Sequence, residues 1–190
     1  MRALQKHEKV GPRICFLDVE ATSLEADVGT TVGIGLMEDD GRFSYISVDR
    51  PELEKNRLKN FLERLERHHI IVTWNGKSFD IPFLVSRIIK HGLRVEPLLS
   101  AYHLDMAEFV KNNLKLSRTD IFHVSKFLGI RKDVATLGQD VPGLYVKAMK
   151  GDRVAVRRIE RHCRDDLNAL RLIFLKLKPL VKLLKPELPI

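Results

Sequence analysis

The sequence predicts an α/β fold, in which helices pack on a sheet whose strands run in mixed directions. Three apolar runs, residues 13–19, 30–37 and 42–48, read as strands, and a helix with one apolar face follows them. Strands and helices then alternate until a long helical segment closes the chain. With 190 residues, the chain is expected to form a single domain over residues 1–190, with its core from about 13 to 178.

The first half of the chain supplies three strands, a helix and a fourth strand. Asp40 and Gly41 stand between the second and third apolar runs, and such a pair favours a hairpin turn. Pro51 opens a helix that extends to about residue 67, with leucines along one face. Residues 70–74 are apolar again and read as the fourth strand.

The second half continues the alternation and then becomes helical. Residues 81–91 read as a helix that Gly92 can end. The next segments are a strand near residues 98–104, helices around 106–113 and 119–128, and a loop over 131–142. A last helix begins near Asp152 and runs to about residue 178, where a proline follows. The tail, residues 179–190, is expected to pack back on the core.

Composition narrows the classes of protein to which the chain can belong. Hydrophobic residues make up 44% and charged residues 31% of the chain, which excludes disorder. We expect no membrane span, because no apolar stretch reaches the roughly 18–20 residues that a span needs, and no secretory signal. Cys15 and Cys163 are too few for a disulfide scaffold or a zinc site, so a reducing, cytoplasmic location is expected.

The net charge of +8 favours a polyanionic partner, either nucleic acid or an acidic membrane surface. The alternative is a soluble protein whose surface is rich in lysine. One basic run lies on the solvent side of the last helix and is either simply solvated or follows a nucleic-acid backbone. Its members are Arg153, Arg157, Arg158, Arg161 and Arg164.

Two acidic residues end the most apolar strand. Asp18 and Glu20 are two positions apart, so on a strand both carboxylates point to the same face. Like charges that are partly desolvated repel each other unless a cation lies between them, and Mg²⁺ prefers carboxylate oxygens as ligands. The pair therefore indicates either a metal site or a strand that ends in two solvated acids.

A third acid follows the fourth strand. Asp80 stands where a helix begins, a few residues after Asn75. An aspartate in this position is ordinarily a helix cap, worth about 1 kcal/mol, and an asparagine after a strand is ordinarily a turn residue. Neither residue alone requires a functional role.

The last helix carries a fourth acid. Apolar residues at helical spacing mark its buried face, and at about 100° per residue Asp166 lies on the margin of that face while Asp165 faces solvent. His162 lies one turn before Asp166 on the same side. This pair is either a salt bridge within the helix or a metal-binding aspartate beside a proton acceptor.

Taken together, these segments resemble the DEDD superfamily of 3′–5′ exonucleases, which have a ribonuclease-H-like fold. Residues 18–20 match the Asp-x-Glu of that family's first strand, and residues 75–80 match its second motif, an asparagine followed by Phe-Asp. Residues 162–166 have the spacing of its third motif, Tyr-x-x-x-Asp, with His162 in the place of the tyrosine. The chain most resembles the stand-alone ribonuclease-H-like exonuclease domains. Three antiparallel strands followed by parallel strands are the sheet that this resemblance implies.

The resemblance also implies a two-metal phosphodiesterase that acts on DNA or RNA, with single-stranded 3′ ends as its substrate. His162 would accept a proton from the attacking water, because the free pKa of histidine is close to neutral. Thr22 and Leu24 would lie near the terminal nucleotide, and Asn75 near the scissile end. The ligands implied for two Mg²⁺ or Mn²⁺ ions are Asp18, Glu20, Asp80 and Asp166.

Two other functions remain open. The histidine at the tyrosine position favours a nucleic-acid-binding module that keeps the fold without the activity. Asp18, Glu20 and Thr22 also loosely resemble the Asp-x-Asp-x-Thr motif of haloacid dehalogenases, in which Asp18 would be the covalent nucleophile of an aspartyl-phosphate phosphohydrolase. Glu20 departs from that motif.

Several polar residues are expected to serve structure rather than chemistry. His68 and His69 end a helix and are expected to be solvated. Trp74 is expected in the core. Asp105 ends a strand and could approach the acidic site.

Overall fold

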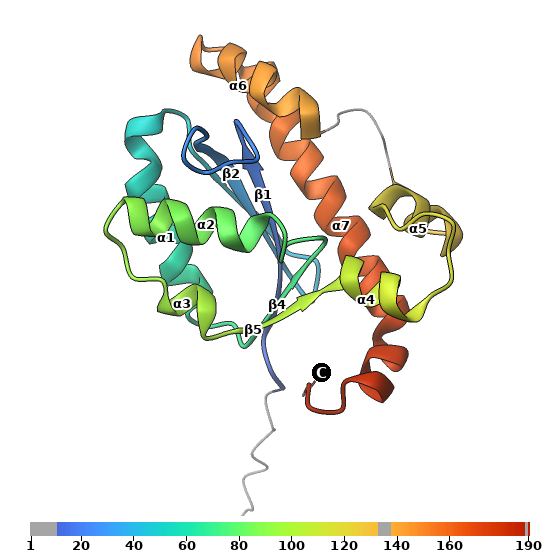
Figure 1. Cartoon of the computed structure of the whole chain (residues 1–190). Helices are drawn as coiled ribbons and strands as arrows, with labels where there is room; N and C mark the ends of the chain where they lie inside the picture. The colour runs from blue at the N-terminus through green and yellow to red at the C-terminus, as the bar shows by residue number, and fades with distance from the viewer. Residues whose placement is uncertain (1–10, 133–137, 189) are drawn as a thin grey trace, which may run out of the picture.

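A five-stranded sheet forms the centre of the fold (Figure 1). The computed structural model describes residues 11–132, 138–188 and 190. The strands are β1 (Ile14–Ala21), β2 (Thr31–Glu38), β3 (Phe43–Ser47), β4 (Ile70–Thr73) and β5 (Tyr102–Asp105). Their order is β3-β2-β1-β4-β5, with β2 antiparallel to both β3 and β1 and with β4 parallel to both β1 and β5. The predicted mixed sheet, three antiparallel strands followed by parallel ones, is confirmed.

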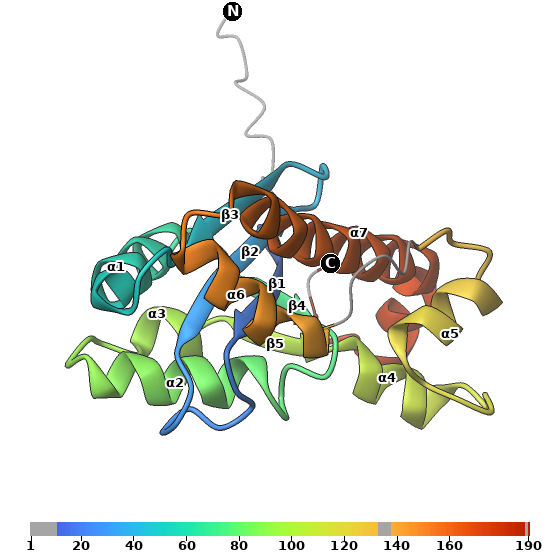
Figure 2. The ribbon, with the colours of Figure 1, turned by 90° about the horizontal axis from the view of Figure 1, so that it is seen from above.

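Three helices cover one face of this sheet, as Figure 2 shows from above. They are α1 (Glu54–Leu65), which a short 3₁₀ turn at Pro51–Leu53 introduces, α2 (Asp80–Lys90) and α3 (Glu96–Leu99). Their leucines and phenylalanines pack on the odd-numbered residues of β1, Cys15, Leu17 and Val19. Gly92 follows α2 with a φ of +65°, the left-handed conformation that the sequence predicts for the end of this helix.

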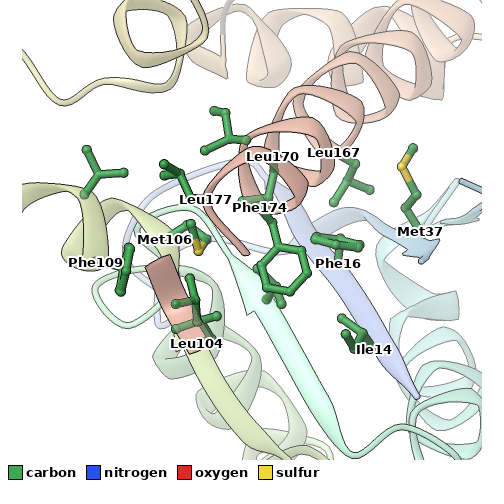
Figure 3. Close-up of a cluster of buried hydrophobic side chains, with 14 of the residues drawn as sticks. Ile14, Phe16, Met37, Leu104, Met106, Phe109, Leu167, Leu170, Phe174 and Leu177 are labelled. Atoms are coloured by element: carbon green, nitrogen blue, oxygen red, sulfur yellow. The ribbon is translucent and has the colours of Figure 1, made fainter. Parts of the chain in front are cut away.

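The other face is covered by α4 (Met106–Asn113), α5 (Ile121–Phe127) and the long helix α7 (Arg153–Leu184). The even-numbered residues Ile14 and Phe16 of β1 point to this side (Figure 3). Phe174 of α7 meets Phe16 edge to face, with the ring centroids 5.5 Å apart. This packing sets the position of α7 relative to β1, on which the site described below depends.

The prediction of a loop over residues 131–142 is wrong at its end. A 3₁₀ turn occupies Gly138–Asp140, and α6 (Val141–Met149) begins directly after it, while residues 133–137 lie outside the described part of the chain. Pro142 makes the segment look like a loop, but it stands in the first turn of α6, where its missing N–H would have no helical partner. Tyr145 of α6 packs against Val32 of β2 and Ile159 of α7.

The prediction that the last helix ends near residue 178 is also wrong. Asp152 caps its start, as expected, but α7 continues through Pro179 to Leu184. A proline inside a helix removes one backbone hydrogen bond. Val181, two residues later, is completely buried, and its burial offsets that loss. The tail does pack back on the core, because Val181 and Leu188 both belong to the main hydrophobic cluster.

The strand expected near residues 98–104 is half correct. Its first part is the short helix α3, in which Leu98 is buried against the side of the sheet that α1 covers, and the strand β5 begins only at Tyr102. Pro97 lies in the first turn of α3, where proline favours a helix. No helix within the described residues has the length and apolarity needed to cross a membrane.

Candidate metal centre

Asp18 and Glu20 continue the face of β1 that carries Phe16, so both carboxylates point toward α7. A carboxylate oxygen from each of them and the sulfur of Cys163 lie within 4.8 Å of one another. The side chain of Glu20 is only 6% exposed. Its Oε1 atom is buried and has no hydrogen-bond partner. A buried carboxylate oxygen without a partner is costly, so this end of β1 is not an ordinary solvated strand end.

Asp80 reaches the same place from the opposite face of the sheet. It is the first residue of α2 and is buried, and its Oδ1 accepts a hydrogen bond of 2.9 Å from the backbone N–H of Val19. That N–H lies between Asp18 and Glu20 in the chain, so the bond holds Asp80 against the acidic end of β1. Its negative charge raises the pKa of Glu20, and the charge of Asp18 raises its own. Asp80 does not cap α2 in the ordinary way, because the capping position is Phe79.

Asp105 fixes the turn that leads to Asp80. Its Oδ1 accepts from the backbone N–H of Asn75 at 2.9 Å, and its Oδ2 from that of Lys77 at 3.0 Å. The same side chain caps α4 through the N–H of Ala107. Each of these hydrogen bonds comes from a backbone N–H. Asp105 therefore supports the acidic site from β5 without being part of it.

α7 brings the fourth acid and the histidine. Nδ1 of His162 lies 3.5 Å from Oδ1 of Asp166, and its Nε2 lies 3.9 Å from Oε1 of Glu20. The ammonium of Lys132, almost fully buried, donates a hydrogen bond to the same oxygen of Asp166. Asp165 is half-buried, which corrects the expectation that it faces solvent. The histidine ring therefore lies between Glu20 and Asp166, and the Lys132 ammonium compensates the charge of Asp166.

A glycine on β2 lets α7 approach the strands this closely. A Cβ atom at Gly35 would lie 2.2 Å from the sulfur of Cys163 and 2.8 Å from Cδ1 of Leu167. Gly35 is also the residue of β2 that pairs with Asp18. Any larger residue there would push α7, and with it His162, away from β1.

The site is strongly anionic and poorly solvated. Burial, together with the negative charge of Asp166, raises the pKa of Asp18 to about 7, although the Cys163 thiol and the Lys132 ammonium oppose the shift. Burial and the neighbouring acids raise the pKa of Glu20 and of Asp80 well above their usual values. Burial lowers the pKa of His162, against the opposing pull of Asp166. Asp18, Glu20 and Asp80 thus resist ionisation, and a further positive charge in the cluster would favour it.

A divalent cation fits this donor set. Hard cations such as Mg²⁺ and Mn²⁺ bind carboxylate oxygens, and the cluster offers several of them, including the unpartnered Oε1 of Glu20. Among the described residues, Asp18, Glu20 and Asp80 have no ion pair with a lysine or an arginine and would be ligands. At Asp166, a metal ion would compete with the ammonium of Lys132 for Oδ1.

The three residues expected to contact substrate lie in loops at this edge of the sheet. Thr22 closes the loop after β1, because its Oγ1 accepts a 2.9 Å hydrogen bond from the N–H of Thr30. Leu24, in that loop, is 75% exposed. Asn75 follows β4, which runs parallel to β1, and its exposed side chain sits on a backbone with a φ of +61°.

Two members of the cluster escaped the sequence analysis. Cys163 could have been found, since helical spacing places it on the buried face of α7, directly after His162 in the chain. Lys132 gave no signal, because a single lysine in an irregular segment resembles any surface lysine.

The expectation that His68 is solvated is wrong. His68 is buried, and its Nε2 lies 3.1 Å from Oε2 of Glu38. Trp74 is only partly buried, although it packs against the main core cluster.

Comparison with known proteins agrees with this architecture. A solved structure of the family B DNA polymerase from the hyperthermophilic archaeon Pyrobaculum calidifontis has a similar fold, with a TM-score of 0.76 and 17% sequence identity. The match covers 90% of this chain and 25% of the polymerase chain, so the chain spans about a quarter of that protein's length. The chain matches none of the curated proteins with which it was compared. A model of the RNase_H superfamily matches residues 15–178, which include every residue of the acidic cluster, and the chain therefore belongs to the RNase_H superfamily.

Proposed function

We propose that this chain is a metal-dependent nuclease of the DEDD type, which hydrolyses phosphodiester bonds of DNA or RNA from the 3′ end by a two-metal mechanism. Membership of the RNase_H superfamily supports a nuclease-type function. The observation that carries the proposal is the meeting of four buried or half-buried carboxylates from β1, α2 and α7 in one cluster, where an oxygen of Glu20 has no hydrogen-bond partner among the described residues. The ionised form of such a cluster is stabilised when a cation compensates the charge.

The residues divide between metal binding and proton transfer. Asp18, Glu20, Asp80 and Asp166 would hold two Mg²⁺ or Mn²⁺ ions, which stabilise the attacking and the leaving oxygen when they are bound. His162 would accept the proton of the attacking water. Its burial lowers its pKa, which keeps the ring neutral and able to accept near pH 7. Thr22 and Leu24 would lie near the terminal nucleotide, and Asn75 near the scissile end.

One observation favours a second candidate, a nucleic-acid-binding module without activity. The Lys132 ammonium bonds to Oδ1 of Asp166 and so competes with a metal ion for this carboxylate. If the pair never opens, the fold keeps its substrate surface while catalysis is lost.

End-labelled single-stranded DNA and RNA, incubated with Mn²⁺ or Mg²⁺, distinguish these candidates. The nuclease predicts stepwise shortening from the 3′ end by the wild-type protein. Asp166→Asn should abolish it, whereas His162→Ala should lower kcat by roughly 10²–10⁴-fold, as expected for loss of a general base. Asp165→Asn is the matched control, because it removes the same charge one residue away, and it should leave most of the activity.

Shortening that Asp166→Asn leaves intact would contradict the proposed site. Binding of either nucleic acid without any turnover, in both metals, would favour the inactive module. Shortening from the 5′ end only would leave the metal centre in place and overturn the proposed polarity.

A further inference from the structure

Beside the acidic centre, the first half of α7 carries four arginines that have no partner. Among the described residues, no carboxylate lies within ion-pair distance of Arg153, Arg157, Arg158 or Arg161. Several other exposed arginines are paired with acids, as in Arg42 with Asp40 at 2.6 Å. A concentration of unpaired guanidinium groups repels itself and is relieved by a polyanion.

The four arginines form one continuous array. Arg153, Arg157 and Arg161 are each four residues apart, so they follow one another at about 6 Å along the helix axis. Arg157, Arg158 and Arg161 line a surface hollow of about 550 Å³. The one acid that lines this hollow, Glu160, is paired with Arg164 at 3.1 Å. The hollow is therefore open to a ligand with negative charges spaced along a line.

The array begins at the acidic centre and leads away from it. Arg158 lies one turn before His162, whose ring is 3.9 Å from Glu20. Arg161 and Arg157 lie progressively farther round the helix, on its solvent side. Figure 1 shows this half of α7 passing the end of the sheet at which β1 finishes. The rigid packing of α7 on β2 through Ala155 and Ile159 fixes the array relative to the site.

We propose that Arg153, Arg157, Arg158 and Arg161 bind the phosphate backbone of a polynucleotide, beyond the nucleotide that occupies the acidic centre. The inference rests on the proposed function, which makes nucleic acid the polyanion that reaches this end of the molecule. Guanidinium groups bind phosphate in a bidentate manner, and a linear row of them matches a chain of phosphates. An acidic membrane is a poorer match, because three of the four arginines line a hollow, which admits a single chain of phosphates more readily than a flat lipid surface.

The test measures binding separately from cleavage. The anisotropy of a fluorescent single-stranded oligonucleotide is titrated in EDTA, at several salt concentrations, with the wild type and with the triple variant Arg157→Gln, Arg158→Gln, Arg161→Gln. Loss of three phosphate contacts should weaken binding by roughly tenfold or more and make the slope of log K against log salt shallower by about 2. The matched control removes three unpaired exposed charges from α1 and the end of α2 and should change neither quantity. It consists of Lys55→Gln, Arg67→Gln and Lys90→Gln.

The outcomes separate this inference from the proposed function. Equal binding and equal salt slopes for the wild type and the α7 variant overturn the inference, even if the wild type cleaves. Wild-type binding that the α7 variant loses supports it, even if no metal gives cleavage and the proposed function fails. If the α7 variant loses binding to anionic lipid vesicles while its oligonucleotide binding is unchanged, the arginines form a membrane-binding surface and the inference is overturned. A dinucleotide substrate, too short to reach the array, should be cleaved equally by both proteins.

Discussion

Asp18 and Glu20 lie close to each other and to Asp166 in the acidic cluster. Without a cation their negative charges repel one another, and burial raises the pKa of both carboxyl groups. Neutralising one of them relieves the repulsion and also removes a metal ligand. Neutralisation should therefore raise the stability of the metal-free protein and lower the stability that bound metal adds.

We expect Asp18→Asn to raise the thermal stability of the metal-free protein, by on the order of 1 kcal/mol, and to abolish stabilisation by Mn²⁺. Differential scanning fluorimetry in EDTA and in Mn²⁺ measures both effects. Asp165→Asn, outside the cluster, should keep the Mn²⁺ response. An Mn²⁺-dependent rise in Tm that survives Asp18→Asn would place the metal elsewhere.

Lys132 competes with metal for Asp166, because its ammonium bonds to the oxygen that faces His162. Lys132→Met should therefore increase the affinity for Mn²⁺ by roughly tenfold, which corresponds to about 1.4 kcal/mol. Isothermal titration calorimetry gives the affinity and the number of ions bound. Lys132→Arg keeps a cation at this place and should bind like the wild type. Weaker Mn²⁺ binding in Lys132→Met would mean that the lysine supports the metal site.

Strand β2 and helix α7 pack closely at Gly35, next to the site. Gly35→Ala should lower the free energy of unfolding by about 1–3 kcal/mol, because the new methyl group would overlap Cys163 and Leu167. It should also reduce Mn²⁺ affinity, since α7 carries Asp166. Gly143→Ala, in α6, is the control, because nothing lies within 4 Å of the added atom there and alanine favours a helix. Chemical denaturation of the two variants provides the comparison.

The loop after β1 is tied to the rest of the molecule by a buried ion pair between α1 and α2. Arg87 donates to Glu54 and to the carbonyl of Ala26, and Glu54 also accepts from the N–H of Thr31. Burial alone would raise the pKa of Glu54, but the hydrogen bonds from Arg87, His91 and Thr31 outweigh it and lower the pKa from 4.5 to about 2. This network holds the loop that carries Leu24.

The pH dependence of folding should reflect this network. A carboxyl whose pKa is depressed in the folded state stabilises the fold fully above its unfolded value and loses that contribution as the pH falls. We therefore expect the contribution of Glu54 to disappear between about pH 4.5 and pH 2. Urea denaturation across this range, with the wild type and Glu54→Gln, measures it. The variant should be less stable at pH 7 and should lose less stability on acidification; parallel pH curves would exclude Glu54 as the cause.

Local sequence was sufficient for strands β1 to β4 and for the acids at the end of β1, whereas the strand directions came from the family resemblance. The alternation of side chains along a strand places Asp18 and Glu20 on one face, and helical spacing places Asp166 and His162 at the margin of the buried face of α7. These relations follow from the geometry of a single strand or helix, so neighbouring residues determine them. The ends of elements were less predictable, as α6 and the extension of α7 past Pro179 show, because burial of Tyr145 and Val181 depends on partners far away in the chain.

The roles of individual polar residues at the site depend on long-range packing. Asp80 and Asp105 are both buried acids next to a strand and a helix, so no local pattern distinguishes them. Asp80 accepts a hydrogen bond from β1, whereas Asp105 holds the turn after β4. Lys132 meets Asp166 across 34 positions in the chain, and Cys163 lies beside Asp18 only because Gly35 leaves room for α7. Such contacts form only when separate elements pack together, so they cannot be predicted from the sequence of any single segment.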